Sequence, residues 1–277
     1  MKPSFIFFGT PYVARDTLAY LVEHGFTPSL VVTNPDAKKG RGQILTSCET
    51  KAWALEHGLP VVTPEALGEK ELGEIRAYGC DYAVVVAYGK IFPESLVNAF
   101  PLGVLNIHYS LLPKYRGASP VESALRAGEP VTGVAIQKMV REMDAGDILA
   151  LQEVPIAPDE TARELKPRLI QVGATLLVDL LPKFERGEVT AMPQDAARIT
   201  RAPKIKKEDG QIELAGDPRE NWNKYRAYAE WPGTFFIEEG KRFKITKAAL
   251  EDDKFVIKRV IPEGKPEMDF AQPRSPR

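Results

Sequence analysis

The feature that most constrains the fold is the alternation of short apolar segments with segments of helical periodicity. Residues 12–24 and 50–57 place apolar side chains at helical spacing, and a glycine ends or follows each segment. Strands that are apolar on both faces require helices on both faces of their sheet. The sequence therefore predicts an α/β fold, a Rossmann-like, doubly wound and mostly parallel sheet. The apolar runs that carry this prediction are SFIFFG (4–9), SLVVT (29–33), VV (61–62), YAVVVA (82–87), VLNIH (104–108), 132–139 and 148–154.

The C-terminal part of the chain has a different pattern and charge. Residues 201–277 carry 17 Lys and Arg against 14 Asp and Glu, whereas residues 1–200 carry 20 against 24. The change follows a proline-bearing segment, 190–203, with little hydrophobic periodicity, which indicates a linker. Beyond it, a helix is expected at 221–230, followed by short strands with glycine turns that suit a small β-barrel. We expect a catalytic domain at 1–189, a linker at 190–204 and a small C-terminal domain at 205–277.

Several classes of protein are disfavoured by the sequence. The first strand-to-helix turn, Gly9-Thr10-Pro11, lacks the G-x-G-x-x-G of dinucleotide-binding sheets, and no phosphate-binding G-x-x-x-x-G-K-[ST] occurs. A net charge of −1 does not suit a globally basic nucleic-acid binder. Two cysteines fit a reducing compartment and are too few for a cysteine-based zinc site. With no apolar run long enough to span a membrane, we expect a cytoplasmic protein without membrane contact.

Only three histidines are present, and two of them have a structural explanation. His24 and His57 each precede a glycine at the end of a predicted helix, where a histidine can bond free carbonyl groups. A long helix is predicted at 161–186. It contains no histidine, and we expect Pro167 to interrupt it early. The third histidine, His108, is therefore the one that marks a candidate site.

His108 ends the strand 104–108, and period-two alternation puts Asn106 on the same face. In doubly wound sheets, ligands bind beyond the carboxyl ends of strands. An amide and an imidazole there suit polarisation of a carbonyl and movement of a proton. Either Asp144 or Asp147 can orient the imidazole, although an Asp-Gly turn needs no catalytic explanation. The alternative interpretation is a polar pair that caps the next loop. One His and one carboxylate form a poor metal site, so we expect no metal and no covalent enzyme intermediate.

The segment NIHYSLLPKYRG (106–117), with DAGD (144–147) downstream, resembles the signature of formyltransferases that use 10-formyltetrahydrofolate. The segments FGTP (8–11) and VAYGKIFP (86–93) resemble the same family, and the resemblance covers almost all of residues 1–250. It implies that a substrate amine attacks the formyl carbon of 10-formyltetrahydrofolate. It also implies that Asn106 and His108 stabilise the developing oxyanion, and that Asp144 tunes His108 and helps to relay protons.

The resemblance also implies which residues contact the folate. The pterin would lie along the backbone of 86–89 and beside the loop at 140–144, and the residues of 110–113 would contact the folate. The folate-binding residues expected on this basis are Val86, Ala87, Tyr88, Gly89, Ser110, Leu111, Leu112, Pro113 and Val140.

The acceptor of the formyl group is indicated by the segment 34–46. It resembles the extended basic loop by which family members that act on tRNA approach the acceptor stem. Lys38, Lys39 and Arg41 would then contact tRNA, although a solvated surface loop explains the same charges. The resemblance thus implies initiator methionyl-tRNA as partner, a monomer, and an OB-like C-terminal barrel that is abbreviated after Val260.

Other functions remain open from the sequence alone. The same catalytic module serves amino-sugar nucleotide N-formyltransferases, which form the nearest alternative. A folate- or RNA-binding protein that has lost catalysis, and a hydrolase that releases formate, are the other two. The complete set of Asn106, His108 and an aspartate argues against loss of catalysis.

Overall fold

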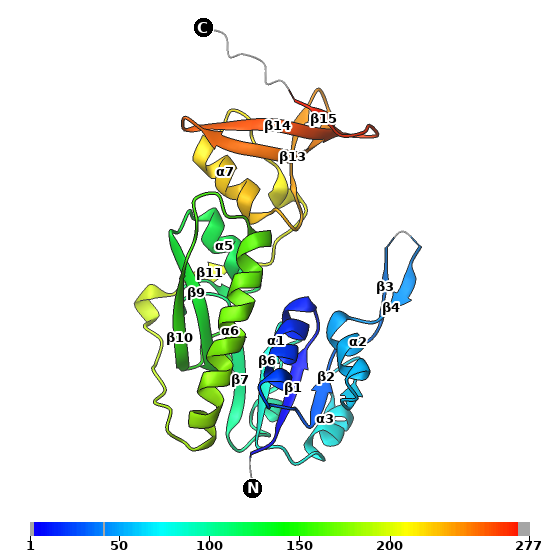
Figure 1. The fold of residues 1–277 in the computed structure, drawn as a ribbon, viewed down its shortest axis with the longest axis vertical. Coiled ribbons are helices and arrows are strands. Elements are labelled where there is room, and N and C mark those ends of the chain that lie inside the picture. The colour runs from blue at the N-terminus through cyan, green and yellow to red at the C-terminus, as the bar shows by residue number, and fades with distance from the viewer. Residues whose placement is uncertain (1–2, 41, 271–277) are drawn as a thin grey trace. The chain divides into compact units, whose positions relative to one another are not determined.

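The structure is a computed structural model that describes residues 3–40 and 42–270. Its contacts divide the chain into two compact units (Figure 1). The first comprises residues 1–116, 133–154 and 167–200, and the second comprises residues 117–132, 155–166 and 201–277. None of the helices formed by the described residues is both long enough and apolar enough to cross a bilayer.

The first unit is built on a seven-stranded sheet with the strand order β10-β9-β7-β6-β1-β2-β5. Its β1–β2, β1–β6, β2–β5 and β6–β7 pairs are parallel, whereas β9 runs antiparallel to β7. The predicted mostly parallel sheet is thereby confirmed. The strands are β1 (Phe5–Gly9), β2 (Leu30–Val32), β5 (Val61–Val62), β6 (Tyr82–Val86), β7 (Gly103–His108), β9 (Val131–Lys138) and β10 (Ile148–Pro155).

Helices cover both faces of this sheet, as continuous apolar strands require. Leu72 and Ile75 of α3 and Leu96 of α4 pack on one face with Ile6, Phe8, Val85 and Val104 of the strands. On the other face, Tyr82 donates a hydrogen bond from its hydroxyl to Glu185 of α6, and Thr175 of α6 contacts Tyr20 of α1. The helices are α1 (Tyr12–Glu23), α2 (Glu49–Glu56), α3 (Glu69–Arg76), α4 (Glu94–Val97) and α6 (Ala162–Glu185).

Helix α6 is continuous, and the expected interruption at Pro167 is wrong. A proline inside a helix costs roughly 3 kcal/mol through its missing N–H and its ring. The helix buries an apolar stripe that outweighs this cost, at Leu165, Leu169, Ile170, Ala174, Leu177, Leu180 and Leu181. Thr161 and Glu164 also cap its first turn, because the Thr161 N–H and hydroxyl both donate to the Glu164 carboxylate.

Packing alone explains the tight turn between β1 and α1, Gly9-Thr10-Pro11. A Cβ at Gly9 would lie 2.4 Å from the Ala14 Cβ and 3.0 Å from the Val86 carbonyl oxygen, so the chain has no room for a side chain there. Pro11 precedes α1, and its carbonyl accepts the Ala14 N–H at 2.8 Å. The interpretation of this segment as a tight turn at a helix start is confirmed.

The basic segment at 34–46 is a β-hairpin. Its strands are β3 (Ala37–Lys39) and β4 (Ile44–Thr46), paired antiparallel with Lys38 opposite Leu45. Ile44 and Leu45 are 69% and 66% exposed, so the hairpin does not contribute to the core. Arg41 lies outside the described residues.

The second unit contains a four-stranded antiparallel sheet with the order β12-β13-β14-β15. Trp222 of α7 packs against Phe236, Ile245 and Ile257 of this sheet. The small C-terminal domain, predicted as an abbreviated OB-like barrel, is present as this antiparallel sheet, and within the described residues its outer strands β12 and β15 do not pair with each other. Its elements are α5 (Pro120–Arg126), α7 (Pro218–Ala227), β12 (Thr234–Glu238), β13 (Lys241–Glu251), β14 (Lys254–Pro262) and β15 (Met268–Asp269).

The predicted linker has local structure of its own. It contains one turn of 3-10 helix, Ala196–Arg198, and the short strand β11 (Arg201–Ala202), which forms a two-stranded sheet with β8 (Arg116–Gly117). A second 3-10 turn, Glu208–Gly210, follows.

Candidate active site

His108 ends β7 on the sheet face that carries the α3–α4 core. Because side chains alternate along a strand, Val104, Asn106 and His108 share this face, and Val104 is the one that packs into the core. His108 is buried, with 5% of the residue exposed. Its Nε2 lies 2.9 Å from the Tyr115 carbonyl oxygen. Since a carbonyl only accepts, Nε2 carries a proton, and Nδ1 is the ring nitrogen left for chemistry.

The loop after β7 brings the Tyr115 carbonyl to His108. The buried Ser110 hydroxyl donates to the Lys114 carbonyl at 2.6 Å, and the Lys114 N–H donates to the Leu111 carbonyl. Tyr115 then takes a left-handed backbone conformation with φ +60°. Such a conformation is unfavourable for a residue with a side chain and persists only where its surroundings hold it.

Asp144 faces the other side of the imidazole. Its Oδ1 lies 3.6 Å from His108 Nδ1, and the two side chains are only 13% and 6% exposed. Asp147, the alternative from the sequence, is exposed, so the structure brings Asp144 and not Asp147 to His108. Asp144 also has a left-handed backbone, with φ +53°. A Cβ at Gly146 would lie 1.7 Å from the Lys138 carbonyl oxygen, so this turn requires a glycine two residues after Asp144.

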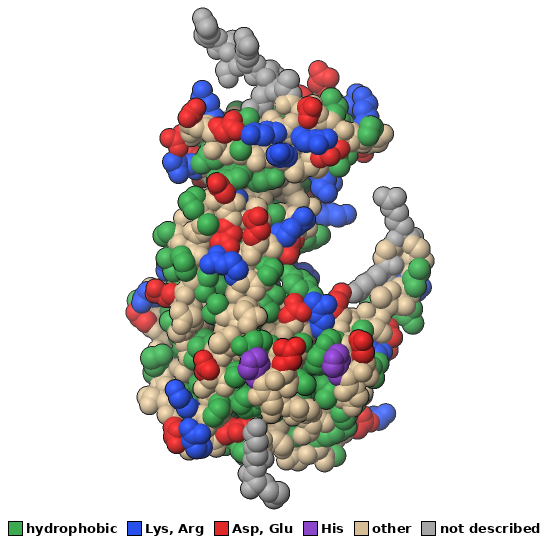
Figure 2. Space-filling view, in the orientation of Figure 1, with side chains coloured by type: hydrophobic (Ala, Val, Ile, Leu, Met, Phe, Trp, Pro, Cys, Tyr) green, Lys and Arg blue, Asp and Glu red, His purple; other side chains and the backbone are tan. Residues whose placement is uncertain are grey.

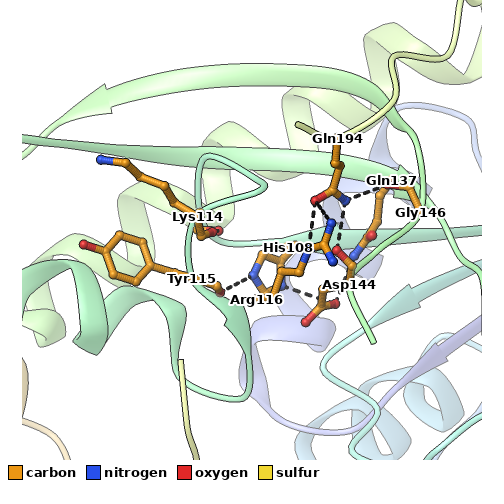
Figure 3. A network of polar contacts seen from close by, with 9 residues as sticks. His108, Lys114, Tyr115, Arg116, Gln137, Asp144, Gly146 and Gln194 are labelled. Atoms are coloured by element: carbon orange, nitrogen blue, oxygen red, sulfur yellow. Dashed lines mark hydrogen bonds and ion pairs between the residues drawn. The ribbon is translucent and has the colours of Figure 1, made fainter. Parts of the chain in front are cut away.

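Two glutamines hold Asp144, and Arg116 bonds one of them (Figure 3). Gln137 of β9 donates from Nε2 to Asp144 Oδ1 at 3.0 Å. Gln194 donates from Nε2 to the Asp144 and Gly146 carbonyls at 2.9 and 2.7 Å. Its Oε1 accepts from Arg116 Nε and Nη2 at 3.0 and 2.8 Å. The carboxylate is therefore held through its side chain and through its backbone.

Asn106 lies beside this pair and is half-buried. It pairs in register with Gln137 of β9, the residue that bonds Asp144. None of the hydrogen bonds between described residues uses the Asn106 side chain, and the Gln137 Oε1 is buried without a partner there. An amide donor and an unsatisfied acceptor thus lie next to the His108–Asp144 pair, where a polar substrate group can meet both.

Sequence reasoning missed the roles of Gln137, Arg116 and Gln194. Gln137 had a signal, because it is an uncharged polar residue directly after the apolar run 134–136, and the structure leaves it only 1% exposed. Arg116 had a weaker signal, since it stands in the 106–117 motif and is 4% exposed. Gln194 had none, because it lies in a segment without periodicity.

The expected folate-binding residues fall into two groups. Ala87, Gly89 and Val140 are exposed and available to a ligand. Tyr88 packs into the α3–α4 core, and burial raises the pKa of its hydroxyl to about 12. The remaining members are buried or half-buried and build the loop and its support: Val86, Ser110, Leu111, Leu112 and Pro113.

Lys90 connects two loops near these residues. Its ammonium donates to the Pro64 and Glu65 carbonyls at 2.5 and 2.8 Å. Burial lowers the pKa of this lysine. The bonds fix the segment after β6 against the segment after β5.

The remaining predicted residues lie at the surface. Lys38 is exposed on β3, whereas the side chain of Lys39 and the whole of Arg41 lie outside the description. His24 and His57 lie at the C-terminal ends of α1 and α2, with Nδ1 2.7 and 2.8 Å from the Tyr20 and Trp53 carbonyls, so their structural role is confirmed.

Charge in the second unit is mixed. Figure 2 shows Lys and Arg side chains interspersed with Asp and Glu over its antiparallel sheet. Lys241, Arg242 and Lys244 are exposed on β13, and the Arg242 guanidinium stacks 3.8 Å from the centre of the Phe235 ring. Over the described part of the chain, no three His, Cys, Asp or Glu side chains cluster as a metal site would require.

Comparisons with known proteins find relatives over most of the chain. A family described as formyl transferase matches residues 1–181, and one described as formyl transferase, C-terminal domain, matches residues 204–262. A methionyl-tRNA formyltransferase of Koribacter versatilis is 44% identical over 245 residues, which cover 88% of this chain and 78% of that protein. One of Geobacter metallireducens is 41% identical over 248 residues, covering 89% and 80%.

Solved structures share the fold. An N-formyltransferase from Helicobacter canadensis, in complex with folinic acid and dTDP-3-aminofucose, superimposes with a TM-score of 0.69 at 20% identity. The match covers 90% of this chain and 88% of that one. Identity at this level indicates a common fold and leaves the acceptor undecided.

Proposed function

This chain belongs to the formyltransferase family, and from that membership and its site we infer that it transfers a formyl group from 10-formyltetrahydrofolate to the α-amino group of methionyl-tRNA. The observation that carries the inference is the placement of Asn106 beside the buried His108–Asp144 pair at the end of β7. Relatives that are 41–44% identical and are named for this reaction support it.

The chemistry follows from what these side chains can donate and accept. The substrate amine adds to the formyl carbon, and negative charge develops on the formyl oxygen. The Asn106 amide is placed to donate to that oxygen, and so is His108 Nδ1 once the imidazole carries a second proton, since Nε2–H is already bonded to Tyr115. Asp144, 3.6 Å from Nδ1, stabilises the protonated imidazole and can take up the proton that the amine releases. When the tetrahedral carbon collapses, its bond to N10 of the folate breaks, and this proton passes to N10, so that tetrahydrofolate leaves and the amine keeps the formyl group.

The site also suits a folate as the formyl donor. The exposed Ala87, Gly89 and Val140 offer backbone and apolar surface to a flat ring. The buried, unpartnered Gln137 Oε1 and the free Asn106 amide offer complementary hydrogen bonds near the reacting group. Ser110, Leu112 and Pro113 would act through the backbone of their loop, because their side chains are buried.

For the acceptor, the exposed β3–β4 hairpin supports an RNA. Lys38 lies on it with the apolar Ile44 and Leu45, a combination suited to phosphate and to stacked or unpaired bases. In the second unit, the exposed Lys241, Arg242 and Lys244 supply further positive charge. Because charged tRNA is the acceptor, the proposal places the enzyme in the cytoplasm, and it includes a monomeric state.

The test is formyl transfer to methionine-charged initiator tRNA, with methionine-charged elongator tRNA in parallel and a dTDP-linked amino sugar as a third acceptor. Formylation of the initiator alone is the expected result. Formylation of the amino sugar without reaction of either tRNA would refute the proposed acceptor and leave the family chemistry intact. Binding of 10-formyltetrahydrofolate with release of formate only would identify a hydrolase.

A further inference from the structure

The segment between the two matched families makes a specific set of contacts with the catalytic loops. This segment, 182–203, lies between the families matched at 1–181 and 204–262. The Gln194 amide makes four hydrogen bonds, two as donor to the Asp144 and Gly146 carbonyls and two as acceptor from Arg116. A side-chain amide between the two matched families thus bonds the turn that carries Asp144 through its nitrogen and Arg116 of the 106–117 motif through its oxygen.

Thr200 makes a second set of contacts in the loop that holds the imidazole. Its Oγ1 accepts the Tyr115 N–H at 2.8 Å, and its carbonyl accepts the Arg116 N–H at 2.9 Å. The Thr200 N–H donates to the Pro113 carbonyl at 3.4 Å. Tyr115 in turn accepts from His108 Nε2.

Both sets of contacts hold residues whose backbone conformation is unfavourable by itself. Asp144 and Tyr115 have φ of +53° and +60°, in the left-handed region that side chains disfavour. They are also the residues on either side of the His108 ring, one at Nδ1 and the other at Nε2. Residues in such conformations stay there only when neighbouring groups hold them.

We propose that Gln194 and Thr200 are positioning residues for catalysis, which hold Asp144 and the Tyr115 carbonyl at the two nitrogens of His108. The linker segment 194–200 then contributes to the geometry of the active site, in addition to connecting the two matched families. The catalytic consequence rests on the proposed function, whereas the effect on the His108 ring does not. Gln194 acts on the carboxylate that faces Nδ1, and Thr200 acts on the carbonyl that fixes the tautomer.

The substitutions that separate this role from simple support are chosen at Thr200. Thr200→Val keeps the shape and removes the acceptor for the Tyr115 N–H, and Thr200→Ser restores the acceptor. Thr190→Val is the matched control, because Thr190 is exposed in the same linker and takes part in none of the hydrogen bonds of the described residues. Gln194→Ala tests the contacts on the Asp144 side of His108.

We expect Thr200→Val to lower kcat by about tenfold, as loss of one net hydrogen bond predicts, and Gln194→Ala, which removes four, to lower it by about tenfold or more. The KM for 10-formyltetrahydrofolate should stay within about twofold, because neither residue meets the substrate. Thr200→Ser should recover most of the kcat, and Thr190→Val should match the parent. Thermal unfolding of each variant measures any loss of stability alongside.

A second readout needs no substrate. The chain has three histidines, so their ring signals can be resolved and assigned by NMR. We expect Thr200→Val and Gln194→Ala to move the ring signals of His108 and to leave those of His24 and His57 unchanged. Unchanged His108 signals with unchanged kcat would overturn the proposal. A kcat loss that Thr200→Ser does not recover, and that scales with lost thermal stability, would also overturn it in favour of a purely structural linker. A parent enzyme inactive on methionyl-tRNA would refute the proposed function alone, because the ring signals still test whether Gln194 and Thr200 position His108.

Discussion

Replacing the Asp144 carboxylate by an amide isolates the charge that faces His108. Asp144→Asn keeps the shape of the side chain and an oxygen that can accept the Gln137 amide. The Asp144 carbonyl, which Gln194 holds, is untouched. What the substitution removes is the negative charge 3.6 Å from His108 Nδ1.

The size of the effect follows from that distance. Two unit charges 3.6 Å apart attract by about 4–5 kcal/mol at the effective dielectric constant of about 20 that suits such sites. Part of this is offset by the cost of burying both groups, whose side chains are only 6% and 13% exposed. A net loss of about 2–3 kcal/mol corresponds to a decrease in kcat of about 30- to 150-fold.

The assay compares kcat for formylation of methionyl-tRNA in Asp144→Asn and Asp147→Asn. Asp147 is an exposed carboxylate three residues away, so its substitution makes the same change of charge without touching His108. We expect Asp147→Asn to match the parent and the KM for folate to change little in either. A kcat within threefold of the parent for Asp144→Asn, or equal losses in both variants, would refute the role of the charge.

Four further outcomes are expected. Asn106→Ala should lower kcat by about 10² or more, since one oxyanion donor contributes about 2.7–4 kcal/mol, while the dissociation constant of the folate measured by fluorescence stays the same. Lys38→Ala should raise the KM for methionyl-tRNA and weaken its dependence on salt, without changing the KM for folate, because Lys38 is exposed on β3. Tyr88→Phe should leave the free energy of unfolding in urea unchanged or raise it by about 1 kcal/mol, since the Tyr88 hydroxyl is buried without a partner among the described residues. Hydrogen bonds from the Thr161 backbone N–H and hydroxyl hold the pKa of Glu164 below its usual 4.5. The ionised Glu164 therefore stabilises the folded protein above pH 4.5, and this contribution is lost as the pH falls through the lower pKa of the folded state. Glu164→Gln should lose less stability than the parent on acidification, which urea titrations above and below this pH range can measure.

The parts of the fold that were predictable are those set by local pattern. Near-continuous apolar strands with intervening helical periodicity predict a sheet covered on both faces, and α3, α4, α1 and α6 cover it as expected. The continuity of α6 across Pro167 was not predictable in this way. Local propensity favours a break there, and only the apolar stripe buried over the length of the helix outweighs it.

The pairing of very short strands is a second feature that the sequence does not predict. The basic segment 34–46 forms a hairpin whose strands are three residues each, too short for a periodicity to be read. In the second unit, apolar alternation predicts strands, but their order and the open edges of the sheet depend on pairings between segments and on β15, which has only two residues.

At the site, the sequence indicates the residues that carry charge or a proton and misses those that hold them. His108 stands out because it is one of three histidines and ends an apolar strand, and Asn106 follows from period two. Choosing between Asp144 and Asp147 needs the backbone of the turn, since both carboxylates lie in the same five residues.

The two glutamines explain why such a site resists prediction. An amide carries no charge and is common at surfaces, so neither Gln137 nor Gln194 differs by type from the other glutamines of the chain. Each becomes specific through the group it meets, Asp144 Oδ1 in one case and the Asp144 carbonyl in the other. These hydrogen bonds join β9, the turn after it and the linker, which are up to 57 residues apart in the sequence. They hold Asp144 in a backbone conformation that an aspartate would not keep alone. The residues proposed as catalytic are therefore close together in the sequence, whereas several of the residues that hold them in place are not.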